Sequence, residues 1–325
     1  MPTTPSTSRL RWGILGTARI NAELAPFMQI EAVASRSLYR ANQANEKLKA
    51  AKAYGSYEDL LADDQINTIY ISLPNHLHHE WTLAALRAGK HVLCEKPLAT
   101  NTADVRALVD AARKADRILA EAFMYRHHAQ TRAIEASLGT QEWGALRHMH
   151  VSFHFSLPTN APNIRLDPSL GGGALLDIGC YATDACLVFA KAAGAGKLIE
   201  AIGRQQIGPT GVNEAFAALL RFSGGATASF DCSFRGPRFD RMQIVCANAS
   251  ITVGHPFKPG VEERLQVVGP DLSGTLIVDE KSPYQRQIED FERAVATSTS
   301  PLVTLAQSEA TASALEQLAA SAARH

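Results

Sequence analysis

The chain has 325 residues, 46% hydrophobic and 20% charged, which is typical of a soluble globular protein and long enough for two domains. Lysine plus arginine and aspartate plus glutamate each number 32, so the formal net charge is zero and no global field would draw the chain to nucleic acid or to an anionic membrane. Disordered and fibrous classes are excluded, and small-molecule chemistry is the better expectation.

The N-terminus, MPTTPSTSRLRWGIL, lacks a basic start followed by an apolar core, and no run approaches the roughly 20 apolar residues of a membrane span. We therefore expect a cytoplasmic protein with no membrane partner. The five cysteines are odd in number and include no Cys-x-x-Cys pair, which favours reduced thiols over a disulfide framework and makes a metal site unexpected.

The first third of the chain alternates short apolar runs with helical patterns. We predict strands over residues 9–16, 30–35, 67–73, 90–95 and 117–124. Apolar residues at three- and four-residue spacing predict helices over 76–89 and 102–115. This alternation predicts an α/β fold whose N-terminal Rossmann domain, at residues 1–123, contains a doubly wound parallel sheet.

The pattern changes after about residue 123. Helices are predicted over 127–138 and 174–190, and strands over 146–155, 215–224, 225–234, 241–250, 250–255, 264–269 and 274–280, before terminal helices. Successive strands joined by turns such as Gly224-Gly225 predict a large, mostly antiparallel open sheet in a C-terminal α+β domain at residues 124–325.

The first chemical signal is GILGTARIN, where the first strand turns into a helix at Gly16. In dinucleotide-binding folds, three glycines in this turn permit a tight bend, close approach to the pyrophosphate and close helix packing. Ala18 and Asn21 occupy the second and third positions here, so a plain strand–turn–helix stays open as an alternative. The residues predicted to contact the cofactor are Gly16, Thr17, Ala18, Arg19 and Ile20.

Ser35, Arg36 and Arg40 lie where an acidic residue would bind the adenosine ribose of NAD, about 20 residues after the glycine turn. A hydroxyl and two cations suit a 2′-phosphate better than a ribose hydroxyl, which favours NADP over NAD. The alternative is a helix cap with a solvated arginine.

Leu73, Pro74 and Asn75 follow the strand at 67–73 and should lie at the carboxyl edge of the sheet, where ligands of doubly wound sheets bind. The neighbouring histidines, at positions 76, 78 and 79, fall on successive sides of one helical turn without a carboxylate or thiolate partner. Surface histidines are favoured over a metal site. We expect His78, of the three, to face the cofactor.

The stretch HVLCEKPLAT sets Glu95 and Lys96 directly against the end of an apolar strand, before Pro97. Burying such a pair is costly, so it marks either a solvated loop start or a site that uses the charges.

A second constellation is GGGALLDIGCYATD, where Asp177 and Tyr181 are four residues apart and share one helix face. Together with a lysine they could handle a proton, or Tyr181 is a surface anchor with an incidental neighbour.

The stretch LPNHLHHEWTLAALRAGKHVLCEKPLA resembles the signature of the Gfo/Idh/MocA oxidoreductases. The resemblance runs from about Arg11 to the final helix and takes in EAFMYRHH, IRLDPSLGGGALLDIGCYATD and SPYQRQIEDFERAV. These last three stretches are most similar to the branch of dimeric dihydrodiol dehydrogenase, aldose dehydrogenase and sugar ketoreductase. Ala18, Asn21 and a short first helix depart from the family pattern.

The resemblance implies roles for several residues. A cis Pro97 after Glu95 would place Lys96 between the nicotinamide ribose and the substrate. Tyr181 aligns with the proposed general acid or base, and Asp177 would orient it or a sugar hydroxyl. The remaining residues that the resemblance brings to the nicotinamide or the sugar are Arg126, Arg165 and Tyr284.

The expected function is hydride transfer between NADP and C1 of a cyclic aldose, giving a lactone, with coupled reduction of a second sugar left open. The alternatives are a trans-dihydrodiol dehydrogenase, a reductase of keto or anhydro sugars, and a regulator that binds NADP and sugar without turnover. We also expect a homodimer, because a broad uncovered sheet exposes apolar side chains.

Overall fold

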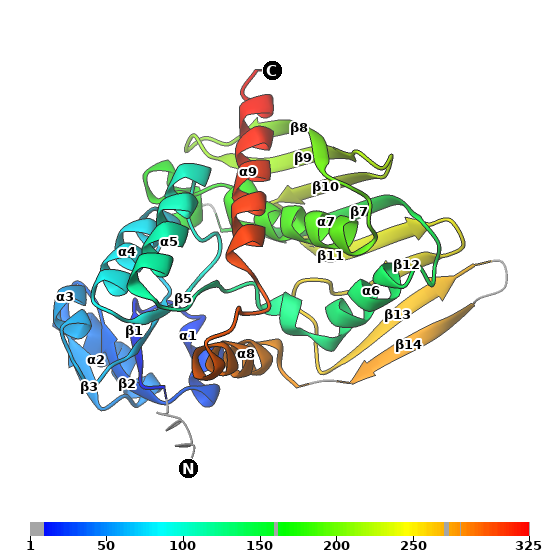
Figure 1. Cartoon of the computed structure of the whole chain (residues 1–325). Helices are drawn as coiled ribbons and strands as arrows, with labels where there is room; N and C mark the ends of the chain where they lie inside the picture. Colours follow the sequence, from blue (N-terminus) through cyan, green and yellow to red (C-terminus); the bar gives the residue numbers. More distant parts are fainter. Residues whose placement is uncertain (1–9, 159–161, 270–272, 280, 325) are drawn as a thin grey trace, which may run out of the picture. The chain divides into compact units, whose positions relative to one another are not determined.

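The computed structural model describes residues 10–158, 162–269, 273–279 and 281–324, and the chain folds into two compact units (Figure 1). The first unit contains the chain up to Leu98, with Ala103–Ala122 and Tyr284–Leu305. The second contains Ala99–Thr102, Phe123–Pro283 and the chain from Ala306 onward. The expected domains, 1–123 and 124–325, differ from this grouping because residues 284–305 pack with the first unit.

The first unit is built on a six-stranded parallel sheet with the order β3-β2-β1-β4-β5-β6. Its strands are β1 (Trp12–Leu15), β2 (Ile30–Ala34), β3 (Lys52–Tyr54), β4 (Thr68–Ile71), β5 (His91–Cys94) and β6 (Leu119–Glu121). All four residues of β1 and of β4 are buried, as expected for strands covered on both faces. The predicted doubly wound parallel sheet is confirmed, and its order reverses between β1 and β4, where ligands of this architecture bind.

Helices cover this sheet in the first unit (Figure 1). They are α1 (Asn21–Leu24), α2 (Leu38–Leu48), α3 (Tyr57–Leu61), α4 (His78–Arg87), α5 (Thr102–Ala115) and α8 (Pro283–Thr297), with a short 3-10 turn at Ala25–Phe27. α8 belongs here because Phe291 packs on Trp12, with ring centroids 5.4 Å apart, and Ile288 joins the same buried cluster. A C-terminal helix thus completes the core of the N-terminal fold.

The second unit is built on an eight-stranded sheet with the order β14-β13-β12-β11-β7-β10-β9-β8. Its strands are β7 (Leu146–Ser156), β8 (Leu198–Ile207), β9 (Asn213–Phe222), β10 (Thr227–Ser233), β11 (Arg235–Cys246), β12 (Ser250–Val253), β13 (Glu262–Val268) and β14 (Ser273–Asp279). Neighbours are antiparallel except β7 and β10, which run parallel. The predicted large, mostly antiparallel sheet is confirmed.

Helices of the second unit are α6 (Ala129–Gly139), α7 (Cys180–Ala192) and α9 (Leu305–Ala322). Short 3-10 turns cover Met124–His127, Ile164–Leu166 and Pro168–Leu170, and a π-helical segment, Leu175–Gly179, precedes α7. Burial alternates along β9, where Phe216, Leu220 and Phe222 are buried while Leu219 and Arg221 are exposed. One face of the sheet therefore packs on a core and the other is open.

The open face carries a continuous hydrogen-bonded row along β7 and β10. Its members in order are Thr227, His148, Ser229, His150, Ser152, Asp231 and His154. The contacts from Thr227 to Asp231 measure between 2.8 and 3.2 Å. Apolar side chains lie at its sides, with Leu219 44% and Phe239 45% exposed. We expected this face to expose apolar side chains. Its centre is polar instead, and apolar side chains lie only beside the row.

The stretch Pro168–Ala192 is, among the described residues, long and apolar enough by composition to cross a membrane. In its most apolar window, 83% of the residues are buried inside the protein. No such run was predicted from the sequence, because Asp177, Asp184 and Lys191 interrupt the apolar residues. The burial is typical of a core helix.

Candidate active site

The turn after β1 is shaped by Gly16. Its φ is +107°, and a Cβ there would lie 3.0 Å from the Ser72 carbonyl oxygen, so no other residue fits without strain. The Gly16 N–H donates to the Ala34 oxygen at 3.0 Å. Asn21, where the family pattern has a glycine, donates its Nδ2 proton to the Gly16 oxygen at 3.0 Å. Asn21, which replaces the glycine of the family pattern, therefore stabilises the turn through this hydrogen bond.

The other predicted residues of this turn surround an open edge. Thr17, Ala18 and Arg19 are exposed, and Ile20 is half-buried. Exposed backbone at the carboxyl end of β1 leaves space for a ligand to approach. The cradle fits the pyrophosphate of a dinucleotide, because Gly16 removes the side chain that would fill it.

Ser35 is buried after β2, whereas Arg36 and Arg40 are exposed. Both guanidinium groups lie near the buried Tyr57, a residue that sequence analysis did not single out. Burial raises the pKa of Tyr57, and the nearby Arg36 and Arg40 charges oppose the rise. Two exposed arginines thus lie near the same phenol beyond β2, where their charges suit a phosphate group.

His78 is buried rather than open to a ligand. Its Nδ1 lies 2.7 Å from the Pro97 oxygen and its Nε2 2.8 Å from the Leu73 oxygen. Burial lowers the pKa of His78, while the two carbonyls oppose that shift. The ring therefore ties the loop after β4, which carries Pro74 and Asn75, to the loop after β5. Its predicted contact with the cofactor stays a prediction.

The Lys96–Pro97 peptide after β5 is cis, as the resemblance implied. Glu95 accepts a hydrogen bond from the hydroxyl of Tyr70 at 2.7 Å. Burial, then Glu95, raises the pKa of Tyr284, which places this phenol near the same carboxylate. Glu95 is thus held by the first unit's own side chains, and Lys96 follows it, half-buried, at the carboxyl edge of the sheet.

In the second unit, Asp177 lies in the π-helical segment before α7 and accepts a 2.6 Å hydrogen bond from Arg165 Nε. A Cβ on Gly172 would lie 2.6 Å from the Arg165 oxygen and 2.7 Å from the Asp167 oxygen, so the glycine-rich stretch allows this close approach. Single-turn π segments are frequent at functional sites. The structure brings Arg165 and Asp177, both predicted site residues, together.

Tyr181 lies in the first turn of α7 and is 9% exposed. Its ring is surrounded by Phe123, Tyr125, Phe153 and Phe257 at centroid distances of 5.4 to 6.0 Å. This aromatic cluster was not predicted from the sequence, because its members come from separate stretches and share no local motif. The four rings thus pack around the Tyr181 ring and leave it largely buried.

Arg126 is buried, with 1% of its side chain exposed, and pairs with two carboxylates of the second unit. Its Nη2 lies 3.1 Å from Glu135 and its Nη1 3.4 Å from Asp184. Asp184 also accepts a 2.5 Å hydrogen bond from the Tyr125 hydroxyl. These contacts give Arg126 a role in holding the residues behind Tyr181, and its predicted contact with the nicotinamide or the sugar stays a prediction.

Histidines 76, 78 and 79 do not form a metal-binding constellation in the structure. Across the described ranges, no group of three or more His, Cys, Asp or Glu side chains is arranged to hold a metal ion. His79 Nδ1 instead lies 3.9 Å from Asp104.

Comparisons with known proteins match both units. The family model described as an oxidoreductase family with an NAD-binding Rossmann fold matches residues 10–123, and the GFO/IDH/MocA C-terminal domain matches residues 131–252. The chain belongs to the Gfo/Idh/MocA oxidoreductase family. The resemblance seen in the sequence is confirmed.

The chain is similar to several enzymes of named activity. A D-xylose 1-dehydrogenase (NADP(+)) from Haloferax volcanii is 36% identical over 90% of this chain and 91% of its own. A trans-1,2-dihydrobenzene-1,2-diol dehydrogenase from Sus scrofa is 36% identical over 69% of this chain and 68% of its own. A 3-ketoreductase from Actinomadura kijaniata, solved with NADP and TDP-benzene, is 28% identical with a TM-score of 0.88, covering 97% and 98% of the two chains.

Proposed function

We propose that the protein is an NADP-dependent sugar dehydrogenase that oxidises C1 of a cyclic aldose to a lactone. The observation that carries the proposal is the similarity to a xylose dehydrogenase along 90% of the chain. The exposed Arg36 and Arg40 beyond β2 support NADP as the cofactor, since they offer two cations to a 2′-phosphate.

The chain's own residues would divide the chemistry as follows. When bound, NADP would supply the acceptor for the hydride that leaves C1 of the sugar. Tyr181 removes the proton of the sugar hydroxyl, and Lys96 supplies the cation that a phenol of normal pKa near 10 needs in order to act as a base at neutral pH. Asp177, paired with Arg165, orients the tyrosine or a sugar hydroxyl, since a carboxylate is too weak a base for an alcohol.

The test is absorbance at 340 nm with NADP or NAD and a panel of cyclic aldoses that includes D-xylose, with identification of the lactone. Reduction of NADP by an aldose is the expected result. If NADP binds but no sugar reduces it, the protein is not a catalyst. That result would favour the alternative of a regulator that binds NADP and sugar without turnover. A rate higher with NAD than with NADP would contradict the cofactor assignment.

A second candidate is the oxidation of carbocyclic trans-diols or the reverse reaction on keto sugars. It is favoured by the similarity to the dihydrodiol dehydrogenase and to the 3-ketoreductase. The same assay, run with a trans-dihydrodiol and with NADPH plus a 3-keto sugar, separates the candidates. A sugar-to-sugar coupling would appear as turnover of two sugars without added NADP.

We also propose that two copies assemble through the open face of the second unit's sheet, in a cytoplasmic enzyme. Support comes from Leu219 and Phe239, which expose apolar surface beside the polar row. Light scattering at micromolar concentration should return twice the mass of one chain. A monomer mass would contradict the assembly and would leave the proposed chemistry untouched.

A further inference from the structure

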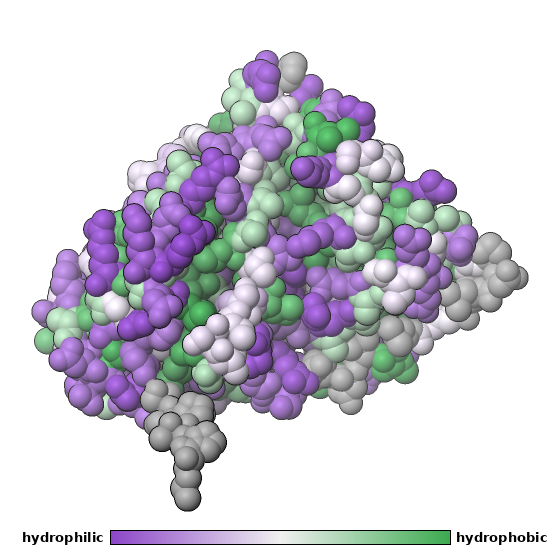
Figure 2. Space-filling model, in the orientation of Figure 1, coloured by the Kyte–Doolittle hydropathy of each residue, from purple (hydrophilic) through white to green (hydrophobic). Residues whose placement is uncertain are grey.

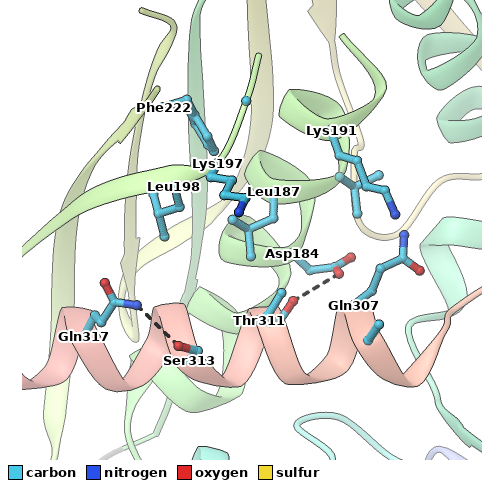
Figure 3. Close-up of a pocket in the computed structure, with 14 residues that line it drawn as sticks. Asp184, Leu187, Lys191, Lys197, Leu198, Phe222, Gln307, Thr311, Ser313 and Gln317 are labelled. Carbon is cyan, nitrogen blue, oxygen red and sulfur yellow. Dashed lines mark hydrogen bonds between the residues drawn. The ribbon is translucent and has the colours of Figure 1, made fainter. Parts of the chain in front are cut away.

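A groove of about 410 Å³ runs between α7 and α9 in the second unit (Figure 3). Its floor includes Leu198 at the start of β8 and Phe222 at the end of β9. Of the residues lining it, Asp184 also contacts Arg126 of the candidate active site, and none was predicted to bind NADP or sugar. Its volume falls in the range of pockets that take small organic ligands, about 300–1,000 Å³.

The walls of the groove are two helix faces. α7 contributes positions 184, 187, 188 and 191, and α9 contributes 306, 307, 310, 311, 313 and 317, so each set lies along one side of its helix. Leu187 and Val188 of α7, with Leu198 and Phe222, form the apolar part of the lining, whereas α9 adds the polar side chains of Gln307, Thr311, Ser313 and Gln317. Hydrophobic residues reach the surface beside the upper part of α9, among hydrophilic ones (Figure 2). The groove therefore suits an apolar body.

The rim of the groove is cationic. Lys191, in the last turn of α7, and Lys197, just before β8, are both exposed. Within the ranges that the structure describes, neither ammonium group makes an ion pair or hydrogen bond. Figure 3 shows Lys197 reaching over the middle of the groove and Lys191 facing Gln307 of α9. The two charges can both reach a ligand seated there.

The acidic residue in the groove does not cancel these charges. Asp184 is 1% exposed, accepts a hydrogen bond from Tyr125 and lies 3.4 Å from Arg126 and from the Thr311 hydroxyl. Its charge is thus neutralised from behind, and the accessible rim keeps the two lysine charges. An anionic ligand group is favoured there over a neutral or cationic one.

We propose that the groove between α7 and α9 binds a small organic anion in which an apolar body carries a carboxylate or phosphate head. The body lies on Leu187, Val188 and Phe222, and the head lies between Lys191 and Lys197. This binding needs neither NADP nor sugar, so it stands apart from the proposed function.

The probes are octanoate and octyl phosphate, with 1-octanol as the neutral match, titrated into the whole protein without NADP or sugar. The methyl NMR signals of Leu187 and Val188 report binding at the groove itself. We expect saturable shifts with a dissociation constant on the order of 1 mM for a ligand of this size. Whichever anion binds more tightly identifies the preferred head group. Octanol should bind more weakly than either.

Three variants test the parts of the proposal. Lys191→Gln with Lys197→Gln should weaken octanoate binding roughly tenfold, since two exposed charge contacts are lost. Ala310→Met, at an exposed helix position, should fill the groove and weaken octanoate and octanol alike. Lys114→Gln, on the exposed side of α5, is the matched control and should change nothing.

The proposal is overturned if Leu187 and Val188 show no saturable shift, if octanol binds as tightly as octanoate, or if the double lysine variant binds octanoate like Lys114→Gln. Thermal melting of each variant confirms that it is folded. None of these results depends on dehydrogenase activity, so failure here and failure of the proposed function are separate outcomes.

Discussion

At the scale of single residues, Arg36 and Arg40 beyond β2 allow a direct test of which cofactor the protein binds. Replacing Arg36 with glutamine should weaken NADP binding roughly tenfold or more, because a charge-assisted contact to the 2′-phosphate contributes about 1.5–3 kcal/mol. NAD, which lacks that phosphate, should bind unchanged. Calorimetric titration of both dinucleotides measures the difference. Arg87→Gln, on the exposed end of α4, is the control, and equal losses for NAD and NADP would refute the assignment.

The role of Tyr181 is tested by removing its hydroxyl alone. Phenylalanine keeps the ring among Phe123, Tyr125, Phe153 and Phe257, so the fold should be retained. We expect turnover to fall by about two to four powers of ten, the range for losing a positioned proton-transfer group, with NADP affinity nearly intact. Near wild-type rates across pH for this variant, together with an inactive Asp177→Asn, would make the carboxylate the base.

His91, at the start of β5, should make the protein less stable to unfolding at acid pH. Its Nδ1 accepts the Ile118 N–H at 3.0 Å, and burial lowers the pKa of His91 to about 4. The unfolded chain, with a histidine pKa near 6.5, binds the proton more readily, so stability is full above about pH 6.5 and falls as the pH drops toward 4. Burial also lowers the pKa values of His78 and His148, which act in the same direction.

The measurement is the melting temperature of wild type and His91→Asn between pH 4 and 8. Asparagine can accept the Ile118 N–H without titrating, so the variant should lose less of its melting temperature on acidification. Identical pH profiles for both proteins would exclude His91 as a contributor.

At the scale of elements, the segment from Arg165 to Tyr181 depends on a glycine that allows two chain segments to touch. Gly172→Ala would push a methyl group against the Arg165 and Asp167 carbonyl oxygens, and overpacking of this kind costs about 1–3 kcal/mol. We expect a lower melting temperature and reduced turnover, because Arg165 holds Asp177. Gly254→Ala is the matched control, since a Cβ there would meet nothing within 4 Å. A variant as stable and active as that control would contradict this account.

Local pattern was sufficient for most elements but not for all. β4 and β5 could be predicted because each contains a short run of apolar residues, Ile69–Ile71 and Val92–Cys94, and β9 because apolar residues run from Ala215 to Leu220. β8 was missed, since at the edge of the sheet its side chains are half-exposed on both faces and show no period. α2 was missed too, because of its eleven residues only Ala41 is buried. The π-helical segment was predicted as ordinary helix, since its backbone register leaves no trace in residue type.

Some residues of the candidate site could be predicted from the sequence and others could not. Gly16, Lys96 and Asp177 lie in short motifs whose chemistry can be recognised from residue type and position. The ring cluster around Tyr181 and the phenols Tyr70 and Tyr57 could not be predicted, because tertiary packing brings them together from distant stretches. The burial of Arg126 and His78 also depends on packing partners that no local pattern specifies.

At the scale of the whole molecule, the chain passes between its two units more than once, and the first unit is not continuous in sequence. A fragment ending at residue 123 would lack α8, which leaves Trp12 without Phe291 and removes Ile288 from the core. Losing such large buried side chains costs about 2–5 kcal/mol each, a large share of a domain's stability. We expect the fragment 10–123 to be largely unfolded, by circular dichroism and amide NMR dispersion.

The control for that fragment is the same chain joined through a flexible Gly/Ser linker to residues 282–305. This fusion should recover cooperative melting, because it restores α8. If the shorter fragment melts cooperatively on its own at the same temperature as the fusion, α8 is dispensable for the first unit.

The row of side chains on β7 and β10 has a direction. Ser152 donates to Asp231, so it accepts from His150 Nε2, and the same logic passes through Ser229 to His148 Nε2 and ends at the Thr227 hydroxyl. In the tautomer of each ring that this order of donors requires, the proton lies on Nε2, and all the donors along these steps point toward one carboxylate. For a neutral ring, the Asp231 charge thus favours one tautomer at His150 and, through two hydroxyl groups, the same tautomer at His148.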